Sequence, residues 1–449
     1  MNGQDFIQQF LPMSIQNIAI SLYNTNLYRK RHSGIYRKMR EYYEDCHSLS
    51  ASEIEAEQQR KLAAFLKYAT ENSAWYAPYK GRQLKDFPIL EKRDVINNLD
   101  RIATIPESQA IVNLTGGTTG SSMKALYTYA DIQERFALLD NFRASYGYSL
   151  GKKVAWFSGK SLIQDRDVAR GTLFRDDHIN RIRFFSTLHI CEKNFDAYWR
   201  AFTEFAPEFI VGITTCVYDI CRMADERNLE FKGHVKAFFS TAETVLDVQK
   251  ETLQKVLGCP LIDQYASSEG APFILQCPHG SMHIHPLSGI FEVVDEQTRP
   301  AREGEILVTS FTTHGTPLIR YRIKDSIRLA PDGFVCPCGS CFPVVEHIDG
   351  RSTDFVLSVD GGRIAAGNIS NSTKGIEGIQ CFQLLQERQD EVTVKMVCSS
   401  RFDNLQEAKF LSALRQRLGA DMKITIVRVP EIPRERSGKF RILKNSMAI

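Results

Sequence analysis

From about residue 110, short strand-type runs alternate with helix-type runs. This alternation constrains the fold more than any other feature. The strand-type runs include KALYTY (124–129), KVAWFSG (153–159), VKAFFST (235–241) and CPLIDQYA (259–266). Helix-type runs lie between them at 131–146, 194–205 and 246–257. Because strands that alternate with helices form largely parallel sheets with crossover helices, the central part is predicted to be α/β.

The regions on either side of this central part show different patterns. Residues 1–100 are predicted to be mostly helical, and Ser50 and Ser52 are candidate caps for the helix that follows them. Runs such as GIFEVVD and GEILVTSF predict an antiparallel, barrel-like section. The last hundred residues combine strand-type runs with the helix-type run NLQEAKFLSALRQRLG, which indicates a small α+β unit. Since the polar turn DGRSTD precedes that unit, the predicted domains are a large multi-part N-terminal domain, 1–352, and a small C-terminal domain, 353–449.

Composition excludes several classes of function. The chain has 449 residues, too many for one ordinary hydrophobic core, and its formal net charge of +3 gives no reason to expect nucleic acid or a membrane as a partner. No apolar run reaches the roughly 18 residues of a membrane span. The N-terminus lacks a basic start followed by a clean apolar core, so it is expected to be part of the folded protein. Eleven cysteines, an odd number in a long chain, favour reduced thiols in the cytoplasm over a disulfide scaffold.

The stretch LTGGTTGSSMK (114–124) is rich in glycine and hydroxyl side chains. Glycines let the backbone approach a ligand closely, and clustered N–H groups with Thr and Ser hydroxyls suit phosphate oxygens. The Gly-Lys-Ser or Gly-Lys-Thr ending found in the phosphate loop of the common nucleotide hydrolases is absent. The stretch is therefore a candidate phosphate-binding loop of another kind, with a Gly/Thr-rich surface turn as the alternative.

Three further polar stretches lie at strand ends or turns. In DQYASSEG, Glu269 is a candidate Mg²⁺ ligand beside a triphosphate, since α/β proteins bind ligands at the carboxyl ends of strands; the alternative is a solvated turn. In TPLIRYRIKD, Asp325 is a candidate acceptor for both hydroxyls of a ribose, or else it pairs with one of the two arginines of the stretch. In EIPRERSGKFRI, Lys439 is suited to neutralise charge on a transferring phosphoryl oxygen; the alternative is an exposed basic tail.

Together and in this order, these stretches resemble the adenylate-forming superfamily of acyl-CoA synthetases, adenylation domains and luciferases. Within it they resemble in particular the phenylacetate–CoA ligase branch and its capsular-polysaccharide-associated relatives. The resemblance covers most of residues 110–449 and is carried by DQYASSEG, TPLIRYRIKD, DGRSTD, RSGKFR and FSTAET (239–244). It implies an enzyme that uses ATP to turn a carboxylic acid into an acyl-adenylate, with release of pyrophosphate, and then passes the acyl group to a thiol. It also implies that the small C-terminal domain is mobile and rotates between the two steps.

The resemblance assigns catalytic roles to Lys439, Glu269 and Thr118. The first step brings two anions together, the acid and the triphosphate. Mg²⁺ on Glu269, the hydroxyls of the Gly/Thr-rich loop and Lys439 would offset their repulsion and favour in-line attack. No Ser or Cys nucleophile is required, which agrees with the absence of a G-x-S-x-G elbow.

The resemblance also assigns nucleotide contacts. Tyr265 would stack on adenine, Asp325 would hold the ribose diol, and Arg351 would contact ribose or phosphate near the hinge. Relatives usually have an acidic residue two positions after that arginine; here Thr353 occupies it and Asp354 follows, which leaves the hinge residue open. The other implied nucleotide-binding residues are Thr115, Gly116, Gly117, Thr119, Gly120, Glu243 and Ser268.

The acyl pocket implied by the resemblance is walled by Ile213, Ala242, Ala266 and Pro272. These residues are small and apolar, which favours a flat aromatic or compact acid. Ala266 stands where relatives usually have glycine, and its methyl group would narrow the space beside Tyr265. CoA is the expected acceptor, a carrier protein or an amine is the alternative, and a non-catalytic adenylate-binding protein is a more distant one. A homodimer is left open, because the sequence is silent on oligomeric state.

Two cysteine-rich stretches predict a metal site beside the catalytic one. CPHGSMHIH and CPCGSC offer thiolates and imidazoles at turns, which are the ligands of closed, four-coordinate Zn²⁺ sites. The predicted ligands are Cys277, His283, Cys336 and Cys338, with His279, His285 and Cys341 as substitutes. Such a zinc would be structural and would tie two loops together, because the chemistry above needs no catalytic zinc. The alternative is a set of reduced surface cysteines without a metal.

Overall fold

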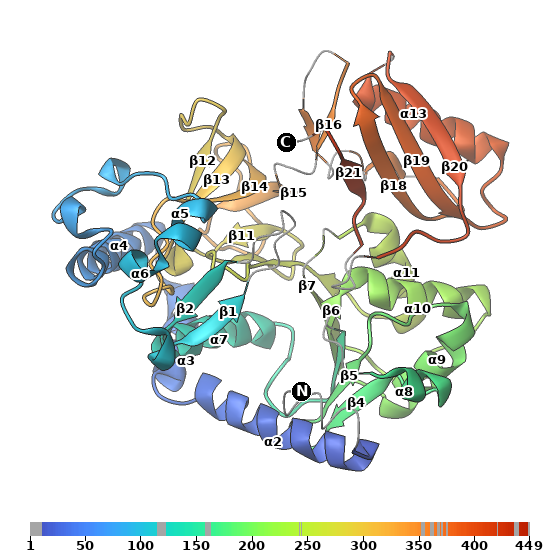
Figure 1. Ribbon diagram of the computed structural model, residues 1–449, viewed down its shortest axis with the longest axis horizontal. Helices are drawn as coiled ribbons and strands as arrows, with labels where there is room; N and C mark the ends of the chain where they lie inside the picture. The colour runs from blue at the N-terminus through green and yellow to red at the C-terminus, as the bar shows by residue number, and fades with distance from the viewer. Residues whose placement is uncertain are drawn as a thin grey trace. The chain divides into compact units, whose positions relative to one another are not determined.

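The structure is a computed structural model of the chain, shown as a ribbon in Figure 1. It describes residues 11–114, 123–157, 163–241, 243, 245–351, 355–359, 363–365, 369, 371–373, 376–419, 421–434 and 440–447. The chain forms two compact units, each built from separate stretches of sequence. The first unit comprises Met1–Ser21, Gly151–Ile262 and Ile348–Ile449, and the second comprises Leu22–Leu150 and Asp263–His347.

A six-stranded sheet organises the first unit. In sheet order its strands are β4 (Phe174–Asp177), β5 (Ile182–Phe185), β3 (Val154–Phe157), β6 (Phe209–Ile213), β7 (Ala237–Thr241) and β8 (Leu261–Ile262). β4 is antiparallel to β5, and the other neighbouring strands are parallel. The helices between the strands are α8 (Asp165–Ala169), α9 (Phe195–Phe205), α10 (Thr214–Glu226) and α11 (Asp247–Leu257). β6, with the sequence FIVGI, is buried along its whole length, as expected for a strand covered by helices.

A smaller sheet in the same unit is formed by the end of the chain. Its order is β20 (Lys423–Arg428), β19 (Glu391–Cys398), β18 (Ile379–Arg388) and β21 (Leu443–Asn445), and a separate hairpin joins β16 (Phe355–Leu357) to β17 (Arg363–Ala365). Helix α13 (Asn404–Leu418) begins at Asp403, whose carboxylate accepts the Gln406 N–H over 2.9 Å. The helix buries Phe410, Leu414 and Leu418 in one core with the strands. The predicted α+β character of this stretch is therefore observed.

A seven-stranded sheet organises the second unit. Its order is β12 (Gly289–Val294), β13 (Glu303–Ser310), β14 (Tyr321–Leu329), β15 (Val344–Arg351), β11 (Met282–Ile284), β10 (Ile274–Gln276) and β9 (Gln264–Tyr265). The helices of this unit are α3 (Tyr36–Asp45), α4 (Ala51–Asn72), α5 (Lys92–Asn97), α6 (Leu99–Ile102) and α7 (Tyr129–Ala144). Ser50 caps α4 in a reciprocal capping box with Glu53, which confirms Ser50 as the cap and leaves Ser52 inside the helix.

The predicted α/β class is confirmed, with a mainly parallel sheet in the first unit and antiparallel pairing in the second. Helix α2 (Met13–Arg31) begins in the first unit and ends in the second. A boundary between residues 352 and 353 remains a prediction. Within the described ranges, no helix combines the length and the apolar character needed to cross a membrane.

Candidate functional site

A tight turn at 267–270 carries Glu269 in the second unit. The Gly270 N–H donates to the Ser267 carbonyl over 3.1 Å. The Ser268 carbonyl accepts from Asn113 Nδ2 at 2.9 Å and from the Tyr127 hydroxyl at 3.2 Å. These two donors lie on β1 (Ile111–Leu114) and β2 (Lys124–Tyr127), the antiparallel pair on either side of the predicted phosphate-binding loop. One hairpin therefore holds the turn of the predicted Mg²⁺ ligand and also fixes both ends of that loop.

A buried arginine holds the other end of this turn. Arg135 in α7 donates to the carbonyls of Gly270 at 3.0 Å and Ala271 at 3.1 Å, and to the Thr312 hydroxyl at 3.0 Å. Its guanidinium also lies over the Phe273 ring, 4.5 Å from the centroid. Burial lowers the pKa of Arg135. Because a buried charged donor binds backbone carbonyls strongly, Arg135 stiffens the chain directly after Glu269.

Gly270→Ala is expected to displace this turn. Gly270 has a φ of +103°, and a Cβ there would lie 2.5 Å from the Tyr127 hydroxyl oxygen and 2.7 Å from a Thr313 methyl carbon. The sequence resemblance assigns Glu269 a catalytic role and implies acid-dependent pyrophosphate release. Because misplacing a catalytic group by about 1 Å can cost of the order of 10²-fold in rate, that release should fall at least ~10-fold. Gly81→Ala is the matched control, because Gly81 also has a positive φ, +76°, but no described heavy atom within 4 Å of the added Cβ. Equal losses of activity in the two variants would contradict the prediction.

Tyr265 and Asp325 are neighbours in the second unit. The Tyr265 hydroxyl donates to Asp325 Oδ2 over 2.6 Å, and the two residues come from β9 and β14. Arg320 and Arg322, the alternative partners of Asp325, form ion pairs with glutamates. The structure thus joins by a hydrogen bond the two residues that the resemblance assigns to adenine and ribose, and those roles stay predictions.

Ile213 and Glu243 lie at the carboxyl edge of the parallel sheet in the first unit. Ile213 is the buried last residue of β6, and Glu243 follows β7. The Glu243 carboxylate accepts from the Thr215 N–H at 3.0 Å and from the Thr215 hydroxyl, and its other oxygen accepts from the Phe440 N–H at 2.7 Å. Burial raises the pKa of Glu243, although these hydrogen bonds oppose the shift. Through Thr215, this carboxylate caps the N-terminus of α10.

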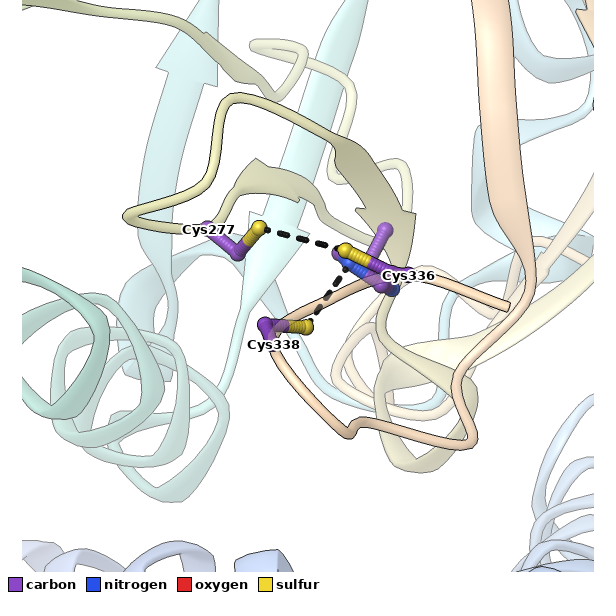
Figure 2. A group of neighbouring side chains, drawn as sticks. Cys277, Cys336 and Cys338 are labelled. Atoms are coloured by element: carbon purple, nitrogen blue, oxygen red, sulfur yellow. Dashed lines mark hydrogen bonds between the residues drawn. The ribbon is translucent and has the colours of Figure 1, made fainter. Parts of the chain in front are cut away.

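Cys277, His283, Cys336 and Cys338 come together in the second unit, and their ligand atoms all lie within 4.8 Å of one another. The Cys277 and Cys336 sulfurs are 3.7 Å apart, and the Cys338 sulfur lies 3.4 Å from His283 Nε2. In a tetrahedral zinc site with usual bond lengths, the sulfur–sulfur edge is about 3.8 Å and the sulfur–nitrogen edge about 3.6 Å. Figure 2 shows the Cys277 sulfur on one loop facing those of Cys336 and Cys338 on another. These distances fit the edges of such a site.

The loops around this group favour metal binding. Both carry the sequence Cys-Pro-x-Gly, in which the glycine N–H donates back to the carbonyl of Cys277 at 2.8 Å or of Cys336 at 3.0 Å. His283 Nδ1 lies 3.0 Å from the Phe342 carbonyl, which can only accept, so Nδ1 carries the proton and Nε2 offers its lone pair to a metal. Although burial raises the pKa of the Cys336 thiol, hydrogen bonds with Ser281, Cys338 and His283 outweigh it and lower the pKa to about 6.

The three residues named as substitute ligands do not belong to this group of ligand atoms. His279 and Cys341 are exposed, and His285 is buried between the rings of Tyr43 and Phe342. The ligand atoms that lie close together are therefore those of the four residues that the sequence analysis preferred.

Several predicted site residues lie outside the described residues, and their roles stay predictions. They are Thr115, Gly116, Gly117, Thr118, Thr119, Gly120, Ala242 and Lys439. Arg351 is the last residue of β15, and the predicted role of its side chain stays a prediction. In the second unit, Ala266 is exposed and Pro272 is buried.

The sequence patterns missed Arg135, Asn113, Tyr127 and Thr215, which hold predicted site residues in place. Arg135 lies in a helix-type run, where a charged residue is ordinarily assigned to the solvent face. Asn113 carries a weak signal, because it is a polar residue in a short strand at the entrance to the Gly/Thr-rich loop.

The chain is similar to several known proteins along most of its length. Residues 356–446 match the family described as CapK C-terminal domain. Protein CapK of Staphylococcus aureus is 28% identical over 466 aligned residues, which cover 99% of this chain and 99% of that one. Phenylacetate-coenzyme A ligase of Escherichia coli (strain K12) is 23% identical over 88% of this chain and 95% of that one. A crystal structure of 2-hydroxyisobutyryl-CoA ligase in complex with an acyl-AMP shares the fold, with a TM-score of 0.71 and 18% identity over 89% of this chain and 91% of that one.

Proposed function

Because this chain belongs to the phenylacetate–CoA ligase-like family of adenylate-forming enzymes, we propose that it is an AMP-forming acid–thiol ligase. It uses ATP to convert a carboxylic acid to an acyl-adenylate and then transfers the acyl group to the thiol of coenzyme A. The observation that carries the proposal is the pairing of Tyr265 with Asp325 in the unit that also holds the turn of Glu269.

In the first step, a carboxylate oxygen bonds to the α-phosphorus of ATP while the bond to pyrophosphate breaks. Asp325 accepts the ribose hydroxyls, and the Tyr265 hydroxyl keeps that carboxylate in one orientation. Glu269 and Lys439 reduce the repulsion between the two anions, Glu269 as the ligand of Mg²⁺, which neutralises phosphate charge when bound. In the second step, the thiol sulfur bonds to the acyl carbon, and AMP leaves with the oxygen of the mixed anhydride. No side-chain nucleophile takes part.

An aromatic or compact acid is the proposed substrate. The residues predicted to wall the pocket are small and apolar, and Ile213 and Pro272 are buried. The Escherichia coli relative is a phenylacetate ligase, which supports an aromatic acid by analogy. Transfer to a carrier protein or an amine is the alternative second step.

Acid-dependent pyrophosphate release, measured across a panel of aromatic and small branched acids with ATP and Mg²⁺, tests this function. At least one acid should release pyrophosphate and, with CoA added, give a thioester. An active acid that gives a thioester with a carrier protein and none with CoA would favour the alternative acceptor. ATP binding without release for any acid would instead support a non-catalytic adenylate-binding protein.

Asp325→Ala is expected to weaken ATP binding. The substitution removes a charged acceptor, and hydrogen bonds to charged groups contribute about 1.5–3 kcal/mol, so KM for ATP should rise roughly 10–100-fold. Tyr265→Phe is the matched variant, because it keeps the ring for stacking and removes the hydroxyl that orients Asp325. Its KM for ATP should rise less. An unchanged KM for ATP in Asp325→Ala would remove this residue from the nucleotide site.

The ligand for the Cys277, His283, Cys336 and Cys338 group is proposed to be a structural Zn²⁺. Three thiolates and one imidazole are a usual closed ligand set for zinc, and the Phe342 carbonyl accepts a hydrogen bond from Nδ1 of the histidine. A bound zinc would fix the two Cys-Pro-x-Gly turns relative to each other, and the chemistry proposed above assigns it no step.

A further inference from the structure

Helix α2 reverses the usual arrangement of polar and apolar side chains. The side chains that it buries are polar, namely Gln16, Asn17 and Ser21. Their oxygens accept hydrogen bonds from β4 and from the residue after it, over 2.7–3.1 Å. Large apolar side chains lie on the outside instead, and Leu22 and Tyr23 are 61% and 62% exposed. Because a helix at a protein surface ordinarily turns its apolar face to the core, this outward apolar face needs another explanation.

The exposed residues follow one stripe along α2, which is a single continuous helix (Figure 1). They recur every three or four residues, the spacing that places side chains on one helix face. The members of the stripe are Ile15, Ile18, Leu22, Asn26 and Arg29. The first three are apolar and the last is basic. Single exposed apolar residues are ordinary at a protein surface, but a row of them marks a site of interaction.

A strongly basic run follows this stripe. From Arg29 to Arg40 the chain has six lysines or arginines and no aspartate or glutamate. The run covers the last turn of α2 and the start of α3. Because only four residues (32–35) connect the two helices, these parts of the two helices lie close together. The exposed basic residues of the run are Arg29, Lys30, Arg37 and Lys38.

The net charge of the whole chain hides this local surplus. It is only +3, because acidic residues elsewhere offset the run. Charges are screened over a Debye length of about 8 Å at physiological ionic strength, so an approaching surface senses the local charge and not the sum over the chain. The local charge, unlike the net charge, predicts attraction to an anionic surface.

Helix stability does not explain the basic residues at the start of α3. Cations stabilise the C-terminus of a helix, as at the end of α2, but they oppose the helix dipole at an N-terminus. The first turn of α3 has no acidic residue, and its N-cap residue, Ile35, makes no side-chain hydrogen bond. Arg37 pairs with Glu41, but these side chains are 91% and 65% exposed, and such pairs contribute little. These charges are thus available to an external anion.

The apolar and basic residues together favour a lipid bilayer over other partners. An anionic bilayer offers phosphates to the basic side chains and an apolar interior to Leu22 and Tyr23, whereas the outside of a nucleic acid offers mainly phosphate. A second copy of the chain would use the same patch twice, because two-fold symmetry pairs a surface with itself, and two basic runs would repel each other. A tyrosine beside a leucine also suits the boundary between headgroups and acyl chains.

We propose that the end of α2 and the start of α3 form a docking surface for an anionic phospholipid bilayer, called the α2–α3 surface. It consists of Leu22, Tyr23, Arg29, Lys30, Arg37 and Lys38. Leu22 and Tyr23 enter the boundary between headgroups and acyl chains, and the basic side chains contact lipid phosphates. No step of the proposed ligase reaction uses these residues, so the surface and the reaction are tested independently.

Vesicle binding tests this surface with the full chain. The probes are vesicles of phosphatidylcholine alone and vesicles of phosphatidylcholine and phosphatidylglycerol in equal parts, and bound protein is measured by co-sedimentation. The partition coefficient should be at least ~10-fold higher for the anionic vesicles, since each basic residue near such a surface adds to binding. Raising the ionic strength from about 0.1 M to about 1 M should release the protein, because the Debye length shortens from about 10 Å to about 3 Å. Equal binding to both kinds of vesicle, or no binding to either, would overturn the proposal.

Arg29→Gln with Lys38→Gln tests the charge of the α2–α3 surface. This double variant should lower the partition coefficient for anionic vesicles roughly 10–30-fold, because two basic contacts are lost. Arg82→Gln with Lys85→Gln is the matched control, because it removes two exposed basic residues of the second unit that lie outside the surface. It should stay within ~3-fold of the wild type, since charges beyond a Debye length are largely screened.

Leu22→Ser tests the apolar part of the surface. It should lower the partition coefficient roughly 5-fold, because an apolar side chain no longer enters the bilayer. Leu405→Ser is its control, since Leu405 is 62% exposed, as Leu22 is 61% exposed, but lies in α13. All these variants should keep the wild-type thermal midpoint, because the substituted side chains are exposed, so that lost binding is not lost folding.

Three outcomes would overturn the proposal and identify what replaces it. Equal losses in the surface variants and their controls would mean that binding depends on the overall charge and not on this surface. Binding to duplex DNA without binding to anionic vesicles would assign the surface to a nucleic acid. A dimer in solution that Leu22→Ser dissociates, again without vesicle binding, would assign it to a second copy of the chain.

Discussion

Lys439→Ala is expected to lower acid-dependent ATP–pyrophosphate exchange by about 10²–10³-fold, the cost of removing one preorganised electrostatic contact from a transition state. Charge builds up on phosphoryl oxygens as the acid attacks and pyrophosphate leaves, and a flexible ammonium group neutralises it without proton transfer. Thioester formation from supplied acyl-adenylate and CoA should remain close to wild type, because the charge-separating step is already complete. Exchange and thioester formation are measured on the same preparations.

Lys124→Ala is the matched control for this prediction. Lys124 lies next to the Gly/Thr-rich loop, but it begins β2 and forms an ion pair with Glu107 at 3.0 Å in which both side chains are largely exposed. Exposed pairs contribute little, so exchange should change less than ~3-fold. A large loss in Lys124→Ala together with normal exchange in Lys439→Ala would move the catalytic lysine into the loop. Wild-type exchange rates in both Lys124→Ala and Lys439→Ala would contradict the proposal that a lysine neutralises charge in the first step.

Local features of the fold were predictable because they depend on residues close together in sequence. The capping box needs only Ser50 and Glu53, and the strand–helix–strand pattern of the C-terminal stretch follows from its hydrophobic periodicity. The Cys/His group was also predictable although its two loops are far apart in sequence. Few side-chain types bind zinc, and the stretches CPHGSMHIH and CPCGSC are rich in them, so the residue types alone indicated which loops would come together.

Contacts that depend on tertiary packing were not predictable. The sequence predicted Tyr265 and Asp325 separately, yet their hydrogen bond depends on the order of seven strands. Arg135 lies in a helix-type run like many surface arginines, and only its burial against backbone carbonyls reveals what it holds. The bond between Glu243 and Phe440 joins positions 197 residues apart, and no periodicity links them. In each case the missing information is which elements pack together.

Cys336→Ser is expected to abolish stoichiometric zinc binding and to destabilise the second unit. A hydroxyl is a poor zinc ligand compared with a thiolate, and the free energy of binding structural zinc contributes directly to folding. Loss of about 2–3 kcal/mol would lower the thermal midpoint by roughly 5 °C or more for a unit of this size. Zinc is quantified by metal analysis after the protein is passed through a chelator, and the midpoint is measured by thermal unfolding.

Cys341→Ser is the control that separates metal loss from loss of a cysteine. Cys341 lies in the same CPCGSC stretch but is exposed and does not belong to the group of ligand atoms. It should keep about one zinc per chain and the wild-type midpoint, whereas Cys336→Ser should lose both, because only the latter removes a corner of the tetrahedron. Wild-type protein without zinc would refute the metal. If zinc is retained in Cys336→Ser and lost in Cys341→Ser, Cys341 and not Cys336 is the zinc ligand. The ligand set that includes the 3.7 Å Cys277–Cys336 contact would then be wrong.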